Sequence, residues 1–469
     1  MAAGPVSGSD DPGLARVERE RLAAAAVEAA RTVGPGRLSP RQRVERLLDA
    51  GSFFELGALA ASQQPGATGP TPGDGLITGF GSIDGLEVAT ISEDPLVLAR
   101  TDGQVAKSKR RRLLKLARQQ QLPIVWFVDG PDGPLPIFPA TGGQLYGGIA
   151  EQYDDVDVRA RRASMIGVVL GSATGQAREL LARCDVLVAT KISPPGGGHE
   201  FDVDVVVDDE ADAVAAARAL VRLDAERAGA GTPAACPPSP VESPGALAGV
   251  PASESIAEQL ADPGTWMAFA RREGSGLISG ILKLAGIPIA IAVTGASGQR
   301  LLGRDDLDGL QRVVAISGRY GIPLLLVQDC DGYAPELMLE RSSARAVSDL
   351  VDALRSLPAP LVSLVAGAGH VLGTYCLGGR QVDPSYVLAW PWARIGVTDT
   401  PAYDAGSLGA YRQPDPWLAA GMGLVDDVVT PEETVPWLRW FVRLAGDRRH
   451  LPPIPPDTRW YARSSIKGT

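Results

Sequence analysis

Residues 121–133 read QLPIVWFVDGPDG, and residues 321–333 read GIPLLLVQDCDGY. Each segment contains a proline, a run of apolar residues, an aspartate and then a turn with glycine. An apolar run of this length that ends in such a turn is typical of a buried strand in a parallel sheet. One such segment is ordinary in an α/β protein. The repeat becomes informative only if further segments recur in the same order.

Two more pairs of segments do recur. GFGSIDGLEVATI (79–91) matches GILKLAGIPIAIA (280–292), and IGVVLGSATGQA (166–177) matches LVSLVAGAGHVLG (361–373). The first of these pairs has two apolar strands around a glycine turn, which indicates a β-hairpin. All three pairs are separated by about 200 residues and keep the same order. The sequence therefore predicts a tandem duplication.

A segment dense in proline, alanine, glycine and serine separates the two halves. Such a composition cannot bury enough apolar surface to fold by itself, so it predicts a linker. We expect a first domain over residues 1–228, the linker over 229–251 and a second domain over 252–469. Each domain is predicted to be α/β, with a hairpin followed by alternating helices and strands. The expected helices include residues 104–120, 211–227, 307–320 and 342–357.

The composition excludes several classes of protein. The 469-residue chain has a net charge of −10, which argues against general nucleic-acid binding. Its 4 cysteines lie far apart without a CxxC pair, as is usual for reduced thiols in a cytoplasm. The first residues lack the apolar core of a signal peptide, and the apolar stretch 284–296 is too short and interrupted to span a membrane. We therefore expect a cytoplasmic protein.

Motifs in both halves resemble those of one known family. RLSPRQRVERLLDAGSFFEL (37–56) is similar to "TARERIDLLLDxGSFxEL", and GDGLITGFGSIDG (73–85) to "GDGVVTGxGxIDG". In the second half, residues 321–333 resemble "IPLxxFVDxPGF", LAWPWARIGV (388–397) resembles "YAWPxAEIxV", and AAGMGLVDDVVTPEET (419–434) resembles "ARGxVDDVIxPxxT". This family is the carboxyltransferase (β) subunit of biotin-dependent acyl-CoA carboxylases, such as propionyl-CoA and acetyl-CoA carboxylase. The resemblance implies tandem crotonase-type domains built from repeated ββα units.

The resemblance also implies a reaction and its partners. Carboxybiotin would release CO2 and take the α-proton of an acyl-CoA, so no side-chain base is needed. Two developing oxyanions would require two sets of backbone N–H donors, one from each half. The chain has no Met-Lys pair, the usual site of biotin attachment. Biotin would therefore arrive on a separate biotin carboxylase/biotin carboxyl carrier subunit, and family members assemble as hexamers, trimers of dimers.

In this family the donors lie in Gly-Gly-Ala turns at the start of a helix, where N–H groups point outward. The matching residues, which are the candidate catalytic residues, are Gly175, Gln176 and Ala177 in the first half and Val371, Leu372 and Gly373 in the second. Backbone N–H groups survive these changes, but Gln, Val and Leu do not allow the close approach that glycine allows. Two alternatives therefore stay open: a biotin-independent acyl-CoA decarboxylase or lyase on the same fold, and a non-catalytic partner subunit in a mixed hexamer.

One basic run could bind the phosphates of coenzyme A. Lys107, Lys109 and Arg110 begin KSKRRRLLK (107–115), and Lys and Arg are common phosphate ligands. A solvent-exposed helix face would explain the same charge run, and we expect that more ordinary arrangement.

Three further residues are candidates for substrate contact. Asp129 and Asp329 end the two repeated strands and are expected to lie on the floor of paired sites. His370 adjoins the second candidate turn and could contact a ligand, although a lone histidine often has a structural role. The 3 histidines are isolated from one another, so no metal site is expected.

Overall fold

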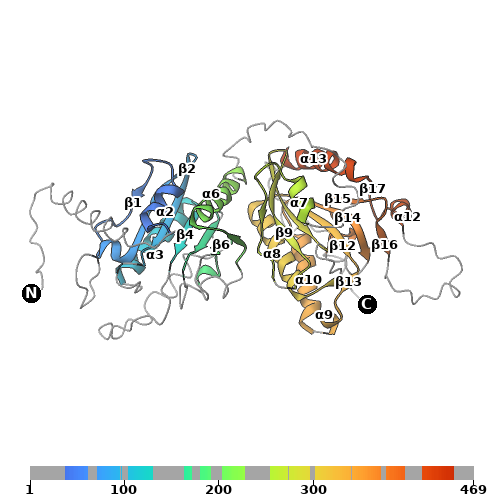
Figure 1. The fold of residues 1–469 in the computed structure, drawn as a ribbon, viewed down its shortest axis with the longest axis horizontal. Helices are drawn as coiled ribbons and strands as arrows, with labels where there is room; N and C mark the ends of the chain where they lie inside the picture. Colours follow the sequence, from blue (N-terminus) through green and yellow to red (C-terminus); the bar gives the residue numbers. More distant parts are fainter. Residues whose placement is uncertain are drawn as a thin grey trace, which may run out of the picture. The chain divides into compact units, whose positions relative to one another are not determined.

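The structure, a computed structural model, describes residues 37–61, 71–95, 97, 104–129, 163–171, 180–191, 203–227, 254–272, 274–295, 301–339, 341–370, 377–396 and 415–447. The chain divides into two compact units, Met1–Ala225 and Glu226–Thr469. Each sheet takes all of its strands from one unit (Figure 1). The predicted linker lies outside the described residues, so the three predicted domain boundaries stay predictions.

The first unit contains a seven-stranded sheet. Its strands follow the chain in the order β1 (Phe54–Glu55), β2 (Leu76–Ile83), β3 (Leu86–Glu93), β4 (Ile124–Val128), β5 (Met165–Val169), β6 (Val186–Thr190) and β7 (Val205–Val207). The first three strands are antiparallel, and the strands from β3 to β7 are parallel. Every residue of β4, β5 and β6 is buried, because a parallel sheet is covered on both faces.

The described helices of the first unit are α2 (Pro40–Leu47), the short 3₁₀ helix η1 (Pro72–Gly75), α3 (Gln104–Gln120) and α6 (Glu210–Arg227). Leu113 and Leu114 of α3 pack in one core with Ile124 and Trp126 of β4. Side chains alternate along a strand, so Val125 and the residues two positions on from it face the opposite side of the sheet. On that side, directly after β4, Asp129 contacts Arg43 of α2, and Arg43 also contacts Glu210 at the start of α6.

The second unit contains an eight-stranded sheet. The strand order is β17 (Asp427–Val428), β15 (Tyr386–Ala389), β14 (Leu361–His370), β12 (Leu324–Cys330), β10 (Ile287–Val293), β9 (Ile278–Leu284) and β8 (Met267–Ala268), and β16 (Arg394–Gly396) pairs with the end of β14. A separate pair consists of β11 (Leu301–Leu302) and β13 (Gly332–Tyr333). Its described helices are α7 (Glu254–Leu260), α8 (Arg304–Tyr320), α9 (Pro335–Leu339), α10 (Arg341–Arg355), η5 (Arg380–Val382), α12 (Pro416–Gly421) and α13 (Pro431–Asp447).

The two sheets share one strand register, which confirms the predicted duplication. In the first hairpin Gly79 pairs with Thr90, and in the second Gly280 pairs with Ile291, each residue 201 positions further along. From there β3 pairs in parallel with β4 as β10 pairs with β12, and β5 and β6 correspond in the same way to β14 and β15. The α/β fold predicted for each half is therefore correct.

The hairpin turns repeat the same side-chain contact. Asp49 accepts hydrogen bonds from the N–H groups of Asp84 and Gly85, each at 2.9 Å. Asp262 accepts the equivalent pair in the second hairpin at 3.1 and 2.7 Å. Both central residues of each turn have positive φ, as a tight two-residue hairpin requires. The duplication thus extends to the capping of the turns.

Within the part of the chain that the structure describes, no helix combines the length and the apolar character needed to cross a bilayer.

Candidate functional site

Sites in parallel sheets lie at the carboxyl ends of the strands, beyond which the loops begin. In the first unit this edge is described up to Asp129 after β4 and Gly171 after β5, and in the second unit up to His370 at the end of β14. The candidate catalytic residues Gly175, Gln176, Ala177, Val371, Leu372 and Gly373 lie outside the described residues. Their roles stay predictions. The structure does describe the contacts at the ends of the strands that lead to them.

A buried group of four charged side chains lies at the carboxyl edge of the first sheet. Arg37 Nη2 donates to Asp129 Oδ1 at 2.7 Å, and Arg43 Nη2 donates to Asp129 Oδ2 at 2.8 Å. Glu210 accepts from the Nε atoms of the same two arginines, at 3.1 and 2.9 Å. We call Arg37, Arg43, Asp129 and Glu210 the ion quartet. Two positive and two negative charges cancel within it, which makes their burial tolerable.

Local sequence signals bring the quartet together. Ser39 and Gln42 form a capping box at the start of α2, with Pro40 in the first turn, so the helix begins at a defined residue. Glu210 is the first residue of α6, where a carboxylate is favoured by the helix dipole. Its Oε2 also accepts the N–H of Leu38 at 3.0 Å. The beginnings of two helices therefore meet at the end of β4.

The quartet also contacts the neighbouring strand ends. Arg37 Nη2 donates a longer hydrogen bond, 3.4 Å, to the carbonyl of Leu170, the residue that follows β5. The N–H of Asp129 donates to Glu93 Oε2 at the end of β3, at 3.1 Å. Burial lowers the pKa of Arg37, but the hydrogen bonds and charges of Asp129 and Glu210 outweigh this and raise the pKa above its ordinary value. Arg37 is therefore always charged.

The arrangement limits the chemistry that Asp129 can perform. Its side chain is fully buried, and both carboxylate oxygens accept hydrogen bonds from guanidinium groups, which do not give up their protons. Asp129 lies directly after β4, at the carboxyl end of the strand, and its contact with substrate stays a prediction. Its carboxylate faces the arginines and is a poor candidate for a general base.

The equivalent aspartate of the second unit has different partners. Asp329 Oδ1 accepts the N–H of Ala368 in β14 at 2.8 Å, and its own N–H donates to Thr294 Oγ1 at 3.0 Å. A Cβ atom at Gly367 would lie 2.3 Å from Asp329 Oδ1. Glycine is therefore required at position 367 to leave room for the carboxylate.

His370 ends β14 with its side chain buried. Its Nδ1 lies 3.4 Å from Asp331 Oδ1, and Arg394 Nη2 lies 3.5 Å from the same oxygen. The three residues come from the ends of β14 and β12 and from the start of β16. Sequence reasoning found His370 but missed Asp331 and Arg394, because their approach depends on which strands are neighbours.

The predicted solvent-exposed helix face is wrong for two of the three basic candidates on α3. Lys109 is buried, and its Nζ donates to the carbonyls of Gly73 and Leu76 at 3.2 and 2.5 Å. Burial lowers the pKa of Lys109 to about 8. Arg110 is also buried, with its guanidinium carbon 5.4 Å from the ring centroid of Trp126.

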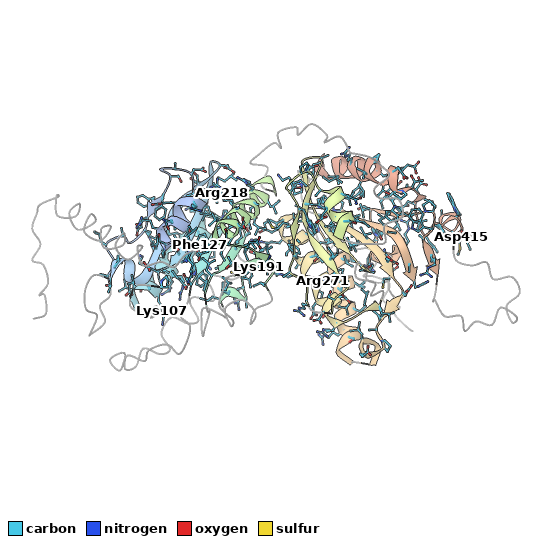
Figure 2. All side chains as sticks on the ribbon, viewed as in Figure 1. Lys107, Phe127, Lys191, Arg218, Arg271 and Asp415 are labelled. Carbon is cyan, nitrogen blue, oxygen red and sulfur yellow. The ribbon has the colours of Figure 1, made fainter. Side chains whose placement is uncertain are left out.

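Lys107 differs from these two residues because it is only half-buried. In Figure 2 it lies at the margin of the first unit, away from Phe127 in the middle of the sheet. Of the three basic candidates, Lys107 is the least buried. The structure therefore brings Lys109 and Arg110 into the interior and separates them from Lys107.

A search of the described residues for three or more His, Cys, Asp or Glu side chains placed to hold a metal ion found no such group. Cys184 and Cys330 are buried, and neither forms a disulfide within the part of the chain that the structure describes.

Comparison with known proteins identifies the family. The carboxyl transferase domain family matches residues 32–187 and 203–402. The methylcrotonoyl-CoA carboxylase beta chain of Dictyostelium discoideum is 25% identical over 419 residues, which cover 78% of this chain and 68% of that protein. The biotin-dependent 3-methylcrotonyl-coenzyme A carboxylase beta1 subunit of Mycobacterium tuberculosis is 27% identical over 435 residues, covering 80% and 78%.

Solved structures show the same fold. The transcarboxylase 12S structure, described as a hexamer assembly with hydrolysed methylmalonyl-coenzyme A bound, superposes with a TM-score of 0.79 at 20% identity over 96% of this chain and 98% of that one. A single-chain, multi-domain long-chain acyl-CoA carboxylase gives 0.74 at 21% identity, over 92% of this chain and 49% of that one. The predicted tandem crotonase-type fold is confirmed. The chain belongs to the carboxyl transferase family, as a divergent member of the β-subunit type found in acyl-CoA carboxylases.

Proposed function

We propose that the chain is the carboxyltransferase subunit of an acyl-CoA carboxylase, moving CO2 from carboxybiotin on a separate carrier to the α-carbon of an acyl-CoA. The observation that carries the proposal is the repeated sheet edge. In each sheet an aspartate lies at the carboxyl end of one strand, Asp129 directly after β4 and Asp329 next to last in β12, and the neighbouring strand, β5 or β14, leads to a candidate turn. Two such turns would supply two sets of backbone donors, as a reaction with two oxyanions requires.

The residues of the first unit fit this chemistry. When bound, carboxybiotin supplies CO2 and a base for the α-proton. Within the ion quartet, both carboxylates accept hydrogen bonds from arginines, so neither is available to remove that proton. This chain would contribute N–H donors instead. The backbone of Gly175, Gln176 and Ala177 would hold one oxyanion, and that of Val371, Leu372 and Gly373 the other.

The thioester substrate would be bound through its charged end as well. Lys107, half-buried at the margin of the first unit, is the member of the basic run that would meet a phosphate of coenzyme A. Asp329 and His370 would lie on the floor of the second site, where β12 and β14 end. None of these three residues is proposed to determine which acyl group is bound.

Assembly and partners are part of the proposal. The relatives include subunits named as biotin-dependent, and the transcarboxylase 12S structure is a hexamer. We infer a homo-hexamer, a trimer of dimers, that works with a biotin carboxylase/biotin carboxyl carrier subunit in the cytoplasm. Light scattering that found a stable monomer at micromolar concentration would contradict this assembly.

The reaction is tested with the purified chain, a biotin carboxylase/biotin carboxyl carrier subunit carrying biotin, ATP with magnesium, and radiolabelled bicarbonate. Label should enter an acyl-CoA, from a series that includes acetyl-, propionyl- and 3-methylcrotonyl-CoA, only when the carrier is present. Gln176→Pro removes one N–H donor and should lower the rate about a hundredfold, which corresponds to ~3 kcal/mol. Gln176→Gly keeps the donor and should retain activity. Biotin found covalently bound to this chain by streptavidin blotting would refute the proposed division of labour.

A second function, biotin-independent decarboxylation of an acyl-CoA, is favoured by the pair His370 and Asp331. Loss of CO2 breaks a C–C bond and leaves its electron pair in an enolate, which must then take a proton at the α-carbon. The imidazole of His370, with its Nδ1 3.4 Å from Asp331 Oδ1, would be the group that passes this proton on. Turnover of malonyl- or methylmalonyl-CoA without biotin, lost in His370→Gln, would establish this function. No turnover alone, together with co-purification with an active paralogue, would instead show a partner subunit.

A further inference from the structure

Asp129 and Asp329 occupy equivalent positions in the two units but make different contacts. Asp129 follows β4 and is fully buried, whereas Asp329 is the sixth residue of β12 and is half-buried. In both units the next strand of the sheet, β5 or β14, leads to a candidate turn. The contacts of each aspartate therefore bear on the direction in which that next strand ends.

The backbone of each aspartate is attached to the preceding strand. The N–H of Asp129 donates to Glu93 Oε2 at 3.1 Å, and the N–H of Asp329 donates to Thr294 Oγ1 at 3.0 Å. Glu93 and Thr294 hold equivalent positions, 201 residues apart, at the ends of β3 and β10. Two unrelated side chains thus make the same connection in the two units.

The carboxylate of each aspartate is attached to the following strand, in two chemically opposite ways. In the second unit Asp329 Oδ1 accepts the N–H of Ala368 directly, at 2.8 Å. In the first unit Asp129 holds Arg37 at 2.7 Å, and Arg37 donates to the carbonyl of Leu170 at 3.4 Å. In the second unit a carboxylate accepts a hydrogen bond from a backbone N–H group, and in the first unit a guanidinium donates one to a backbone carbonyl.

We propose that Asp129 and Asp329 are positioning residues for the two candidate turns and not ligands of the acyl-CoA. Each joins the carboxyl ends of three neighbouring strands and so sets the direction in which the chain leaves β5 or β14. Backbone donors must be held to within about 0.5 Å of their productive place, so a small shift of this exit lowers the rate of the reacting step. The effect on turnover rests on the proposed function, whereas the effect on strand order does not.

The second unit gives the sharper test, because the hydrogen bond from the Ala368 N–H to residue 329 can be kept by one substitution and removed by another. Asp329→Asn removes the charge but keeps an Oδ1 acceptor for the Ala368 N–H, whereas Asp329→Ala removes both. Positioning predicts that Asn keeps kcat within about threefold, and that Ala lowers kcat roughly ten- to a hundredfold with KM for acyl-CoA nearly unchanged. Gly367→Ala should resemble Asp329→Ala, because its Cβ would lie 2.3 Å from Oδ1 and displace the carboxylate. If Asp329→Asn lowers kcat as much as Asp329→Ala does, or if the loss of activity comes from a raised KM, Asp329 is a charged ligand and the proposal is wrong.

In the first unit Asp129 itself is a poor test, because its removal leaves Arg43 buried without one of its partners. Arg37→Gln is the better variant, since the Arg37 side chain is 28% exposed and Arg43 continues to bind Asp129. It should lower kcat about tenfold. Arg41→Gln, in the helix α2 that follows Arg37, breaks a half-buried pair with Glu55 at 2.7 Å that lies outside the ion quartet; it is the matched control and should leave kcat unchanged.

Hydrogen exchange measured by mass spectrometry separates this proposal from the proposed function. In the protein without substrate, peptides ending at residues 171 and 370 should exchange faster in Arg37→Gln and in Asp329→Ala, respectively, and Asp329→Asn should match the wild type. If the wild type shows no turnover, the proposed function fails while the exchange data still test positioning. Unchanged exchange in both Arg37→Gln and Asp329→Ala would overturn the proposal.

Discussion

Replacing Arg43 by methionine should destabilise the first unit and leave the second unit unaffected. Arg43 is 1% exposed and donates to Asp129 Oδ2 at 2.8 Å and to Glu210 at 2.9 and 3.1 Å. Methionine fills a similar volume without a charge. The carboxylates of Asp129 and Glu210 would then share Arg37 alone, so the quartet would carry a net buried negative charge.

The size of the effect follows from these contacts. Removing one partner of a buried ion pair costs ~3–5 kcal/mol, because the other partner is left uncompensated. Arg37 still binds both carboxylates, and Arg43 Nη1 is buried without a hydrogen-bond partner among the described residues, so the lower end of that range applies. A loss of ~3 kcal/mol corresponds to a fall in melting temperature of ~6–12 °C for a unit of this size.

The assay must report each unit separately. Urea unfolding followed by pulsed hydrogen exchange gives a midpoint for peptides from β4 and β5 and another for peptides from β12 and β14. The first midpoint should fall and the second should not. Arg41→Met, which breaks the more exposed pair with Glu55, should cost about 1 kcal/mol. Adding Glu210→Gln to Arg43→Met removes one uncompensated charge and should recover part of the loss.

Two results would refute this reasoning. If Arg43→Met and Arg41→Met lower the first midpoint equally, burial of the quartet is not what makes Arg43 matter. If Glu210→Gln deepens the loss in the Arg43→Met background, the carboxylate is not the source of the destabilisation.

Three other predictions concern single positions. Burial lowers the pKa of Lys109 to about 8, so the unfolded chain binds this proton more tightly and the free energy of unfolding should rise between about pH 8 and pH 10.5. In urea titrations Lys109→Met should remove this rise, which is on the order of 3 kcal/mol. If the wild type and the variant show the same pH dependence, the prediction is wrong. The N–H groups of Gly85 and its neighbour lower the pKa of Asp49 to about 2, so its contribution is present above its ordinary pKa of 3.8 and is lost as pH falls through about 2; an Asp49→Asn variant that shows the same acid dependence by circular dichroism would be evidence against it. Gly280→Ala would place a Cβ 2.3 Å from the carbonyl oxygen of Met267 and should cost ~3 kcal/mol in thermal unfolding, whereas Gly421→Ala, with no atom within 4 Å of its Cβ, should be neutral; equal effects would show that β8 and β9 separate easily.

The elements could be predicted from the sequence because local patterns determine them. The helix expected over residues 104–120 is α3 without a change, and the helix expected over 211–227 begins one residue earlier, at Glu210. The helix expected over 307–320 begins at Arg304, because its acidic first turn precedes the apolar residues used to find it. Repeated glycine turns and apolar runs were enough to align the two sheets.

In the basic run on α3, helical periodicity and charge density give opposite predictions. Lys109 and Arg110 lie at helical spacing from the apolar residues Ala106, Leu113 and Leu114, so periodicity places them on the buried face. The density of charge in the run favoured a solvent-exposed face instead. Buried carbonyls of η1 and β2 and the ring of Trp126 compensate these charges, and such partners are far away in the sequence.

The ion quartet could not be predicted by any local rule. Asp129 is 86 residues from Arg43, and Arg43 is 167 residues from Glu210. Each residue alone has an ordinary explanation, as a helix residue, a helix cap or a turn residue. Only the order of the strands and the placing of two helix beginnings at one edge bring the four together.

The order of the first sheet has a consequence for how the chain is made. Its strands lie side by side in the order of synthesis, so each new strand adds to one growing edge, and N-terminal domains generally fold first as the chain emerges from the ribosome. All seven strands are complete at Val207, but Glu210 follows them. A nascent chain that stops at Val207 therefore has its entire sheet while Arg37 and Arg43 share Asp129 as a single counter-ion. Synthesis of α6 supplies the second carboxylate, and only then do the charges of the ion quartet cancel.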